Sequence, residues 1–496
     1  MEITIGISVL TIGLYYWLTS TFDFWTSRGV PGPSPKILFG NVFDVVFGKI
    51  SLAEYLKMEY EARRDERMFG IFVRKRPALV LIDPDLMKDV LVRDFSSFSN
   101  RGMKIGEEIS PTFNNLFNID VAYWRPLRTK LTPIFTSGKL KKMFYLLLEC
   151  GENLEKYLAK LTSENDTVEC RELAAKFTTD VIGSCVFGLQ ANALADEDSE
   201  FREIGKEIFN FDWKLIVRTR IRDFAPWLYY LLKPVLVNWR IGNFLLKIMR
   251  ETVEYRKNNR IVRHDFIDLL AKLRDNPNSI DDIELTDILL ASQLYIFFAA
   301  GFETSGTTIS NVLYELAQHQ TVQDKLRDNI SQALTESGGK MTYECIKSIK
   351  YLHMIIQETL RKYPPGFSIV RTSTEPYTFA GTKVTIPIGT DVIIPVYGIH
   401  RDPRIYPKPE VFDPERFTDE AIKTRHPMSW LAFGEGPRNC IGASFAWYQS
   451  KVGLIKILQN YRVEICDKTK IPIVFDKESF LLTPAHGIHV KITRLN

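Results

Sequence analysis

The pattern of apolar and polar positions is mostly helical, with a few short alternating stretches. Between residues 139 and 260, apolar side chains recur at three- and four-residue spacing, which predicts a series of amphipathic helices. Residues 284–319 predict one long helix that is apolar on nearly every side in its first half and therefore buried. Short strands are predicted at residues 68–73, 78–82, 377–396 and 471–492. The predicted fold class is mainly α with a small β region.

The first residues stand apart from this pattern. Residues 3–18 are almost entirely apolar, and residues 19–25 extend the run with aromatic side chains. About 20 apolar residues cross a bilayer as a helix, so we expect residues 1–27 to form a single transmembrane anchor. A cleaved signal peptide is the alternative, although the run lacks a basic start and a small-residue cleavage site. The first positive charges, Arg28 and Lys36, place the body in the cytosol.

Three Pro residues within five positions follow, so residues 28–36 are expected to form a stiff spacer. No Gly/Ser-rich linker or repeat divides residues 37–496, which we treat as one catalytic domain. Residues 213–230 mix three arginines with aromatic side chains. This mixture suits a membrane interface, and an exposed helix pair with snorkelling arginines fits it equally well.

Composition narrows the function classes. A net charge of +4 over 496 residues is too small to indicate nucleic-acid binding. The six cysteines are scattered, without a CxxC pair, which indicates free thiols in a reducing compartment.

A glycine-rich loop brings one of these cysteines, Cys440, to the start of a predicted helix. Gly436 and Gly442 permit backbone angles or close approaches that a Cβ would block. The helix dipole and the neighbouring Arg438 would stabilise a thiolate, which could bind a metal, and Phe433 could shield its sulfur. The alternative is a buried structural cysteine in a tight turn.

The spacing of Phe433, Gly436, Arg438, Cys440 and Gly442 resembles the haem-ligand loop of the cytochromes P-450. The resemblance extends over several motifs from Trp124 to Gly442. It implies the cytochrome P-450 fold, haem b (iron protoporphyrin IX) as cofactor, Cys440 as the axial ligand of the iron, and Phe433 and Arg438 as haem contacts.

Two further motifs point to the haem carboxylates. Trp124 and Arg128 are four residues apart and share one helix face, which alone would indicate a surface packing pair. The resemblance implies that both bind a haem propionate, with Arg371 as a second propionate-binding arginine.

The middle of the long helix carries polar residues in an apolar setting, Glu303 and Thr304, next to Ala300 and Gly301. The Thr304 hydroxyl can bond the carbonyl four residues back and open the helix, and Gly301 would make room for a ligand. A kink filled by water is the plainer interpretation. The resemblance implies a dioxygen-activation segment in which Thr304 and Glu303 guide protons.

Glu358 and Arg361 are spaced as a routine helical ion pair. Their distance from Arg416 matches the structural triad of the resembled family, so we predict a scaffold for the cysteine loop. The expected substrate pocket is apolar and aromatic. Its predicted lining residues are Phe113, Phe117, Ala300, Phe302, Phe367, Leu481 and Leu482.

The predicted function is that of a monooxygenase in the endoplasmic reticulum (microsomal) membrane, similar to insect members of the family that metabolise plant compounds and insecticides. By resemblance, electrons come from NADPH through a separate flavoprotein, NADPH-cytochrome P-450 reductase, with cytochrome b5 as a second donor. The other partners are O2, a lipophilic small molecule and membrane lipids. Two alternatives stay open: a haem-thiolate isomerase or dehydratase, and a non-catalytic haem-binding sensor.

Overall fold

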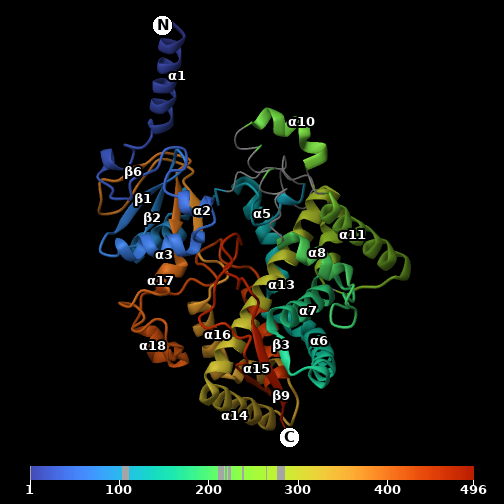
Figure 1. Cartoon of the computed structure of the whole chain (residues 1–496). Helices are drawn as coiled ribbons and strands as arrows, with labels where there is room; N and C mark the ends of the chain where they lie inside the picture. Colours follow the sequence, from blue (N-terminus) through green and yellow to red (C-terminus); the bar gives the residue numbers. More distant parts are fainter. Residues whose placement is uncertain are drawn as a thin grey trace.

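The computed structural model describes residues 2–102, 111–209, 225–236, 239–263, 265–275 and 285–495, with the single residues 217 and 221. Figure 1 shows a part rich in strands beneath the N-terminal helix and a larger helical part around α13. The helices of the first half are α1 Glu2–Thr19, α2 Phe43–Val46, α3 Leu52–Ala62, α4 Pro84–Lys88, α5 Val121–Leu131, α6 Ser137–Glu164, α7 Cys170–Ile182 and α8 Glu200–Phe209. The later helices are α10 Pro226–Leu236, α11 Arg240–Asn259, α12 Phe266–Asp275, α13 Asp287–Gln318, α14 Gln320–Glu336, α15 Tyr343–Ser348, α16 Lys350–Lys362, α17 Val396–Ile399, α18 Asp419–Lys423 and α19 Ala443–Leu458.

The β structure consists of small sheets, so the predicted fold class is confirmed. The largest has the order β1-β2-β7-β4, in which β2 and β7 are parallel and the other pairs are antiparallel. A second sheet has the order β3-β9-β8, and β5 pairs with β6. The strands are β1 Met68–Val73, β2 Arg76–Leu81, β3 Thr167–Glu169, β4 Ile369–Thr372, β5 Tyr377–Thr378, β6 Thr385–Ile386, β7 Asp391–Ile394, β8 Tyr461–Glu464 and β9 His489–Arg494.

Helix α13 is the centre of the helical part. It starts at Asp287 because the side chain of Thr286 caps it, accepting from the backbone N–H of Leu289. Helices α7, α11, α16 and α19 pack around it, which explains why its sequence is apolar on nearly every side. Within the described residues it is the helix long and apolar enough to cross a membrane, yet about two thirds of its apolar stretch is buried inside the protein.

Of the predicted anchor, residues 1–27, only residues 2–19 belong to helix α1, which projects away from the body in Figure 1. Its apolar side chains are exposed, with Ile3 80% accessible. Helix α10 lies on the same side of the molecule and exposes Trp227, while Tyr229 is buried. Most of the predicted interfacial segment 213–230, including its three arginines, lies outside the described residues.

The segment after α1 is fixed to the sheet before the proline-rich run begins. Trp25 is buried, donates its indole N–H to the Ile71 carbonyl at 3.0 Å, and fills the space that a side chain at Gly70 would need. The Gly70 N–H in turn donates to the Pro31 carbonyl at 2.8 Å. The predicted spacer therefore lies against β1. Its position is fixed by this contact as well as by the stiffness of its prolines.

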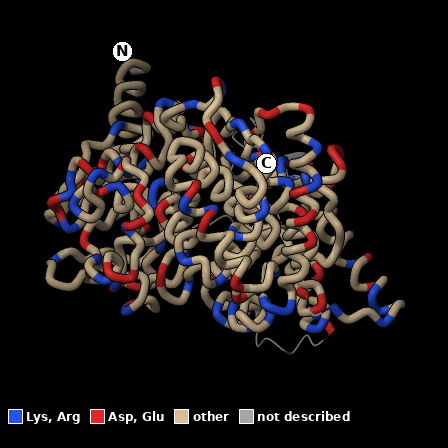
Figure 2. Tube along the Cα trace, turned by 90° about the horizontal axis from the view of Figure 1, so that it is seen from below, with Lys and Arg blue, Asp and Glu red and all other residues tan. Residues whose placement is uncertain are grey.

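Smaller differences follow from local geometry. The strand predicted at residues 78–82 begins earlier, at Arg76, where β2 pairs with Val73. Helix α4 ends at Lys88, and a π-helical turn, Asp89–Arg93, follows it directly. Of the strands predicted at residues 471–492, only β9 and an isolated bridge between Phe475 and Pro484 form. Acidic and basic residues are interspersed along the chain trace in Figure 2, in keeping with the small net charge.

Candidate active site

The cysteine loop is a tight turn held by its own backbone. The N–H of Cys440 donates to the Phe433 carbonyl at 2.8 Å. Gly436 has φ +75, and a Cβ there would lie 1.8 Å from the Leu91 carbonyl oxygen, so only glycine fits. Gly442 differs from the expectation: its φ is −90 and a Cβ would meet nothing within 4 Å.

The Cys440 side chain is exposed, as is the neighbouring Asn439. Desolvation raises the pKa of its thiol, while the Gly442 N–H and the guanidinium groups of Arg128 and Arg101 act to lower it. A thiol can be both exposed and partly desolvated if its sulfur faces an internal space that solvent reaches. Arg438, expected to stabilise the thiolate, is replaced in that role by Arg128 and Arg101. A bound metal ion would deprotonate the thiol outright.

Four arginines surround this space: Arg101, Arg128, Arg371 and Arg438. Burial lowers the pKa of Arg371 to about 10 and that of Arg438 to about 9, where the charge of Arg371 adds to the effect. Burial also lowers the pKa of Arg101, again with the charges of the other arginines. The buried Nε atoms of Arg101, Arg371 and Arg438 have no hydrogen-bond partner in the described structure. Such a cluster requires a ligand with several negative charges.

Trp124 and Arg128 share helix α5, as predicted, and Trp124 lies beside the arginine cluster. The Trp124 ring is buried, and the Arg438 guanidinium lies 4.4 Å from its centroid. Arg128 donates to the backbone carbonyl and the side-chain oxygen of Asn439, each at 3.1 Å. Arg128 therefore also holds the residue next to Cys440.

Arg101 was missed by sequence reasoning. It donates to the Arg438 carbonyl at 3.0 Å, and its guanidinium lies 3.8 Å from the Phe117 ring centroid. The available signal was an arginine at the start of the segment that leads to Phe113 and Phe117. Its contact partner lies 337 residues away in the chain, which no local pattern reveals.

The polar segment of α13 is open where it was expected to be. The Thr304 hydroxyl donates to the Ala300 carbonyl at 2.7 Å, and Ala300 is exposed although its helix is buried. Gly301 serves packing instead of making room for a ligand, because a Cβ there would lie 2.3 Å from the Ile182 side chain on α7. Ala300 and Thr304, four residues apart, share the accessible face of α13.

Glu303 and Phe302 point away from that face. The Glu303 carboxylate is buried and accepts from Arg171 of α7 at 2.6 and 3.2 Å. The Phe302 ring is fully buried against Phe298 and Phe209, so its predicted place in the pocket lining is wrong. Successive residues of an α-helix are about 100° apart, which is why neighbours of Thr304 in sequence are not its neighbours in space.

The predicted scaffold triad forms as expected. Glu358 and Arg361 are fully buried and joined by two hydrogen bonds of 2.6 and 2.8 Å. The Arg416 guanidinium lies 3.5 Å from the Glu358 carboxylate. Arg361 also donates to the carbonyls of His400 and Pro409, so the triad attaches the loop after α17 to helix α16.

His400 connects this scaffold to the cysteine loop. Its Nε2 accepts from the backbone N–H of Leu431 at 2.9 Å, two residues before Phe433. Burial, with the charge of Arg361, lowers the pKa of His400 to about 3. The ring therefore stays neutral and remains an acceptor at physiological pH.

The other predicted lining residues are partly or fully buried. Phe113 and Phe117 are half-buried, and Phe117 lies beside the arginine cluster. Phe367, Leu481 and Leu482 are buried, and the Leu482 N–H donates to the Pro365 carbonyl at 3.0 Å. The structure thus brings the C-terminal segment to the turn that precedes Phe367.

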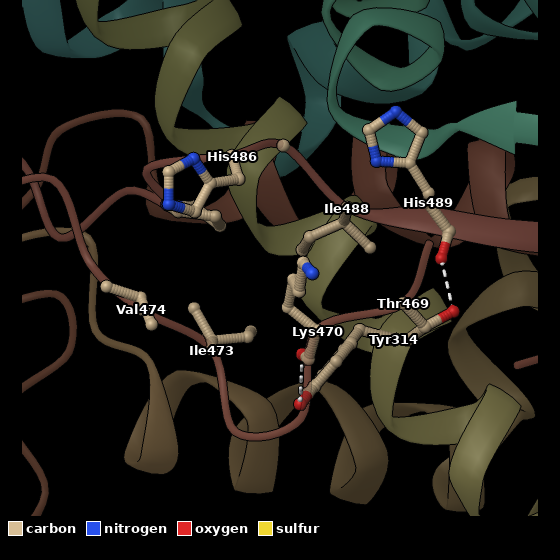
Figure 3. A pocket seen from close by; sticks show the side chains of 10 residues that line it. Tyr314, Thr469, Lys470, Ile473, Val474, His486, Ile488 and His489 are labelled. Atoms are coloured by element: carbon tan, nitrogen blue, oxygen red, sulfur yellow. Dashed lines mark hydrogen bonds between the residues drawn. The ribbon is translucent and has the colours of Figure 1, made fainter. Parts of the chain in front are cut away.

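Two other cavities share no lining residue with this site. A cleft of about 260 Å³ lies between α3 and residues 472–475. The cavity in Figure 3 has about 10 Å³, the size of one water molecule. His486 and His489 lie on opposite sides of it, and the described residues hold no group of three metal-binding side chains.

An accessible thiol near a helix N-terminus fits an iron porphyrin with two carboxylates, because the buried arginines beside it form no ion pair with the residues that the structure describes. Cys440 would bind the iron, while Arg101, Arg371 and Arg438 would hold the carboxylates with Trp124 and Arg128.

Comparison with known proteins points the same way. A family model described as Cytochrome P450 matches residues 30–491. Probable cytochrome P450 6a13 of Drosophila melanogaster is 38% identical over 99% of both chains. Cytochrome P450 6A1 of Musca domestica is 37% identical over 98% of this chain and 97% of its own. Cytochrome P450 6k1 of Blattella germanica is 38% identical over 97% and 95%. With its accessible Cys440 and this match over nearly its whole length, the chain belongs to the cytochrome P450 family and is a haem-thiolate monooxygenase.

Proposed function

We propose that the protein is an NADPH-dependent monooxygenase of lipophilic small molecules, such as plant allelochemicals, insecticides or endogenous hydrophobic compounds. Electrons come from NADPH through a separate flavoprotein reductase. The observation that carries the proposal is that Cys440 is exposed, and that Ala300 and Thr304 are accessible on the otherwise buried helix α13. The aromatic side chains of Phe113, Phe117 and Phe367 support a lipophilic substrate.

The roles of the chain's own residues follow from their positions. The haem, when bound, activates dioxygen and places one oxygen atom in the substrate. The Thr304 hydroxyl, bonded to the Ala300 carbonyl, can accept a further hydrogen bond from a water and pass protons into the site. Glu303 is the proposed acid of this pair. Its carboxylate is held by Arg171, so it must leave that ion pair to reach the Thr304 hydroxyl.

The first test is Thr304→Ala in the haem-loaded protein with NADPH and a flavoprotein reductase. Product per NADPH should fall by at least roughly tenfold, because a positioned proton donor typically contributes about 100- to 10,000-fold to the step that it serves. Peroxide release should rise, while the absorption spectrum should stay unchanged, since haem binding does not need the hydroxyl. Thr308→Ala is the matched control, because the Thr308 hydroxyl bonds the Thr304 carbonyl of its own helix.

Full coupling of NADPH to product in Thr304→Ala would remove Thr304 from the mechanism. The alternatives give different results in the unmodified protein. An isomerase or dehydratase would turn over without NADPH, and a haem-binding sensor would form no product under any condition.

We further propose that α1 anchors the protein in the endoplasmic reticulum membrane with the catalytic domain in the cytosol. The exposed apolar side chains of α1, and the exposed Trp227 on the same side of the molecule, support this arrangement. N-terminal sequencing of the membrane-bound protein should find residues 1–27 retained. A mature chain that begins after them would show a cleaved signal peptide instead.

A further inference from the structure

Helix α13 carries a line of buried polar side chains that continues from Thr304 toward its C-terminus. Thr307, Asn311 and Glu315 follow Thr304 at spacings of three, four and four residues. At 100° per residue these four side chains lie within an arc of about 80°, on the face that carries Ala300 farther up. We call them the α13 polar stripe.

The stripe holds polar atoms that the described structure leaves without partners. Thr307, Asn311 and Glu315 are all almost completely buried. Nevertheless Thr307 Oγ1, Asn311 Oδ1 and Nδ2, and Glu315 Oε2 have no hydrogen-bond partner among the described residues. Neighbouring hydroxyls are satisfied differently: Ser310 donates to the Thr307 carbonyl and Thr308 to the Thr304 carbonyl.

Unpartnered polar atoms inside a protein are costly, and bound water is their usual partner. Four such atoms on one helix face, at consecutive turns, indicate a row of waters more readily than four separate defects. We propose that the α13 polar stripe is a water-filled path that supplies protons from the protein surface to Thr304. The inference rests on the proposed role of Thr304 and adds the route by which protons reach it.

The spacing suits such a path. Four residues of a helix advance about 6 Å, and two successive O–H···O hydrogen bonds span about 5.6 Å. One water can therefore bridge Thr307 to Asn311, and another Asn311 to Glu315. A hydroxyl both donates and accepts, so Thr307 can pass a proton on to a water beside Thr304, while the Asn311 amide orients waters.

The outer end of the stripe reaches the surface. Glu315 Oε1 accepts from Lys362 Nζ at 2.7 Å and from the Tyr363 hydroxyl. Glu315 Oε2 lies 3.5 Å from His319 Nδ1, which is also 2.8 Å from the Glu315 backbone carbonyl, and the His319 side chain is 36% exposed. Protons can thus pass from solvent to His319 and Glu315 Oε2 while Lys362 and Tyr363 hold the other oxygen in place.

The reaction consumes protons, which the path would supply. Monooxygenation combines O2, two electrons and two protons with the substrate to give the hydroxylated product and one water. The electrons come from NADPH through the flavoprotein, and both protons come from solvent. Because Glu303 is paired with Arg171, the polar stripe offers a route that does not require that ion pair to open.

The test uses Thr307→Val and Asn311→Leu, which keep side-chain volume and remove the polar atoms. Thr308→Val is the matched control, because its hydroxyl is already bonded within the helix. In the haem-loaded protein with NADPH and reductase, both stripe variants should lose roughly tenfold in coupled product, release more peroxide and show a changed solvent deuterium isotope effect. The control should behave as the unmodified protein.

A readout independent of turnover is the crystal structure of the haem-loaded protein. It should show ordered waters between Thr304 and Glu315, and a dry contact there would overturn the proposal. Thr304→Ala distinguishes a failure of the proton path from a failure of the proposed role of Thr304. If Thr304→Ala uncouples and the stripe variants do not, the path is wrong and the proposed function stands. If Thr304→Ala stays fully coupled, Thr304 itself has no such role.

Discussion

Replacing Arg361 by alanine is expected to cost about 3–5 kcal/mol of folding free energy, because it leaves the Glu358 carboxylate buried without its main partner. Arg361 donates four hydrogen bonds from a fully buried position, two of them to Glu358. A domain is stable by only about 5–15 kcal/mol, so the variant should yield little folded, haem-containing protein. Thermal unfolding and the haem content per chain measure this.

Two further variants make the prediction specific. Arg361→Lys keeps the charge without the bidentate geometry and should lie between alanine and the unmodified protein. Lys57→Ala breaks the exposed ion pair with Glu61 on α3 and should cost less than about 1 kcal/mol. Equal losses from Lys57→Ala and Arg361→Ala would show that the buried triad has no special structural role.

Replacing Cys440 by alanine is expected to leave the fold intact and to remove the activity completely. The Cys440 side chain is exposed, so its loss creates no cavity in the core, while the loop is held by backbone bonds and by Arg128. The arginine cluster remains to bind haem carboxylates, but no thiolate remains to bind the iron. Circular dichroism should be unchanged, and product formation with NADPH and reductase should disappear.

Cys440→Ser tests whether the thiolate itself or only the size of the side chain matters, because a hydroxyl fits the same space and is far less acidic. It should be as inactive as alanine. Turnover that persists in either variant would mean that another residue binds the iron.

The local motifs could be predicted because their geometry depends on residues close in sequence. The bond from Thr304 to Ala300 and the pair of Glu358 and Arg361 are consequences of helical spacing. The glycine at position 436 likewise follows from a turn that no other residue can form beside Leu91. Helix α13 was predicted as buried because its first half is apolar on every side.

What the sequence could not predict depends on packing between distant segments. The partner of Glu303 is Arg171, 132 residues earlier, and its presence turns the acid away from Thr304. Gly301 was misread because its neighbour Ile182 lies on another helix. The attachment of the predicted spacer is similar, since it depends on the bond from Gly70 to Pro31 and on the burial of Trp25 against Gly70. Phe302 was the avoidable error, because helical periodicity alone places it opposite Ala300.

The proposed function depends above all on the Cys440 thiolate as the ligand of the haem iron. The most direct test is the absorption spectrum of the reduced, carbon monoxide-treated protein, purified with its haem. The structure predicts a Soret band at the long wavelength that thiolate ligation produces, and its absence from Cys440→Ala. A band at the shorter wavelength of a histidine-ligated haem in the unmodified protein, or an unchanged long-wavelength band in Cys440→Ala, would contradict the account.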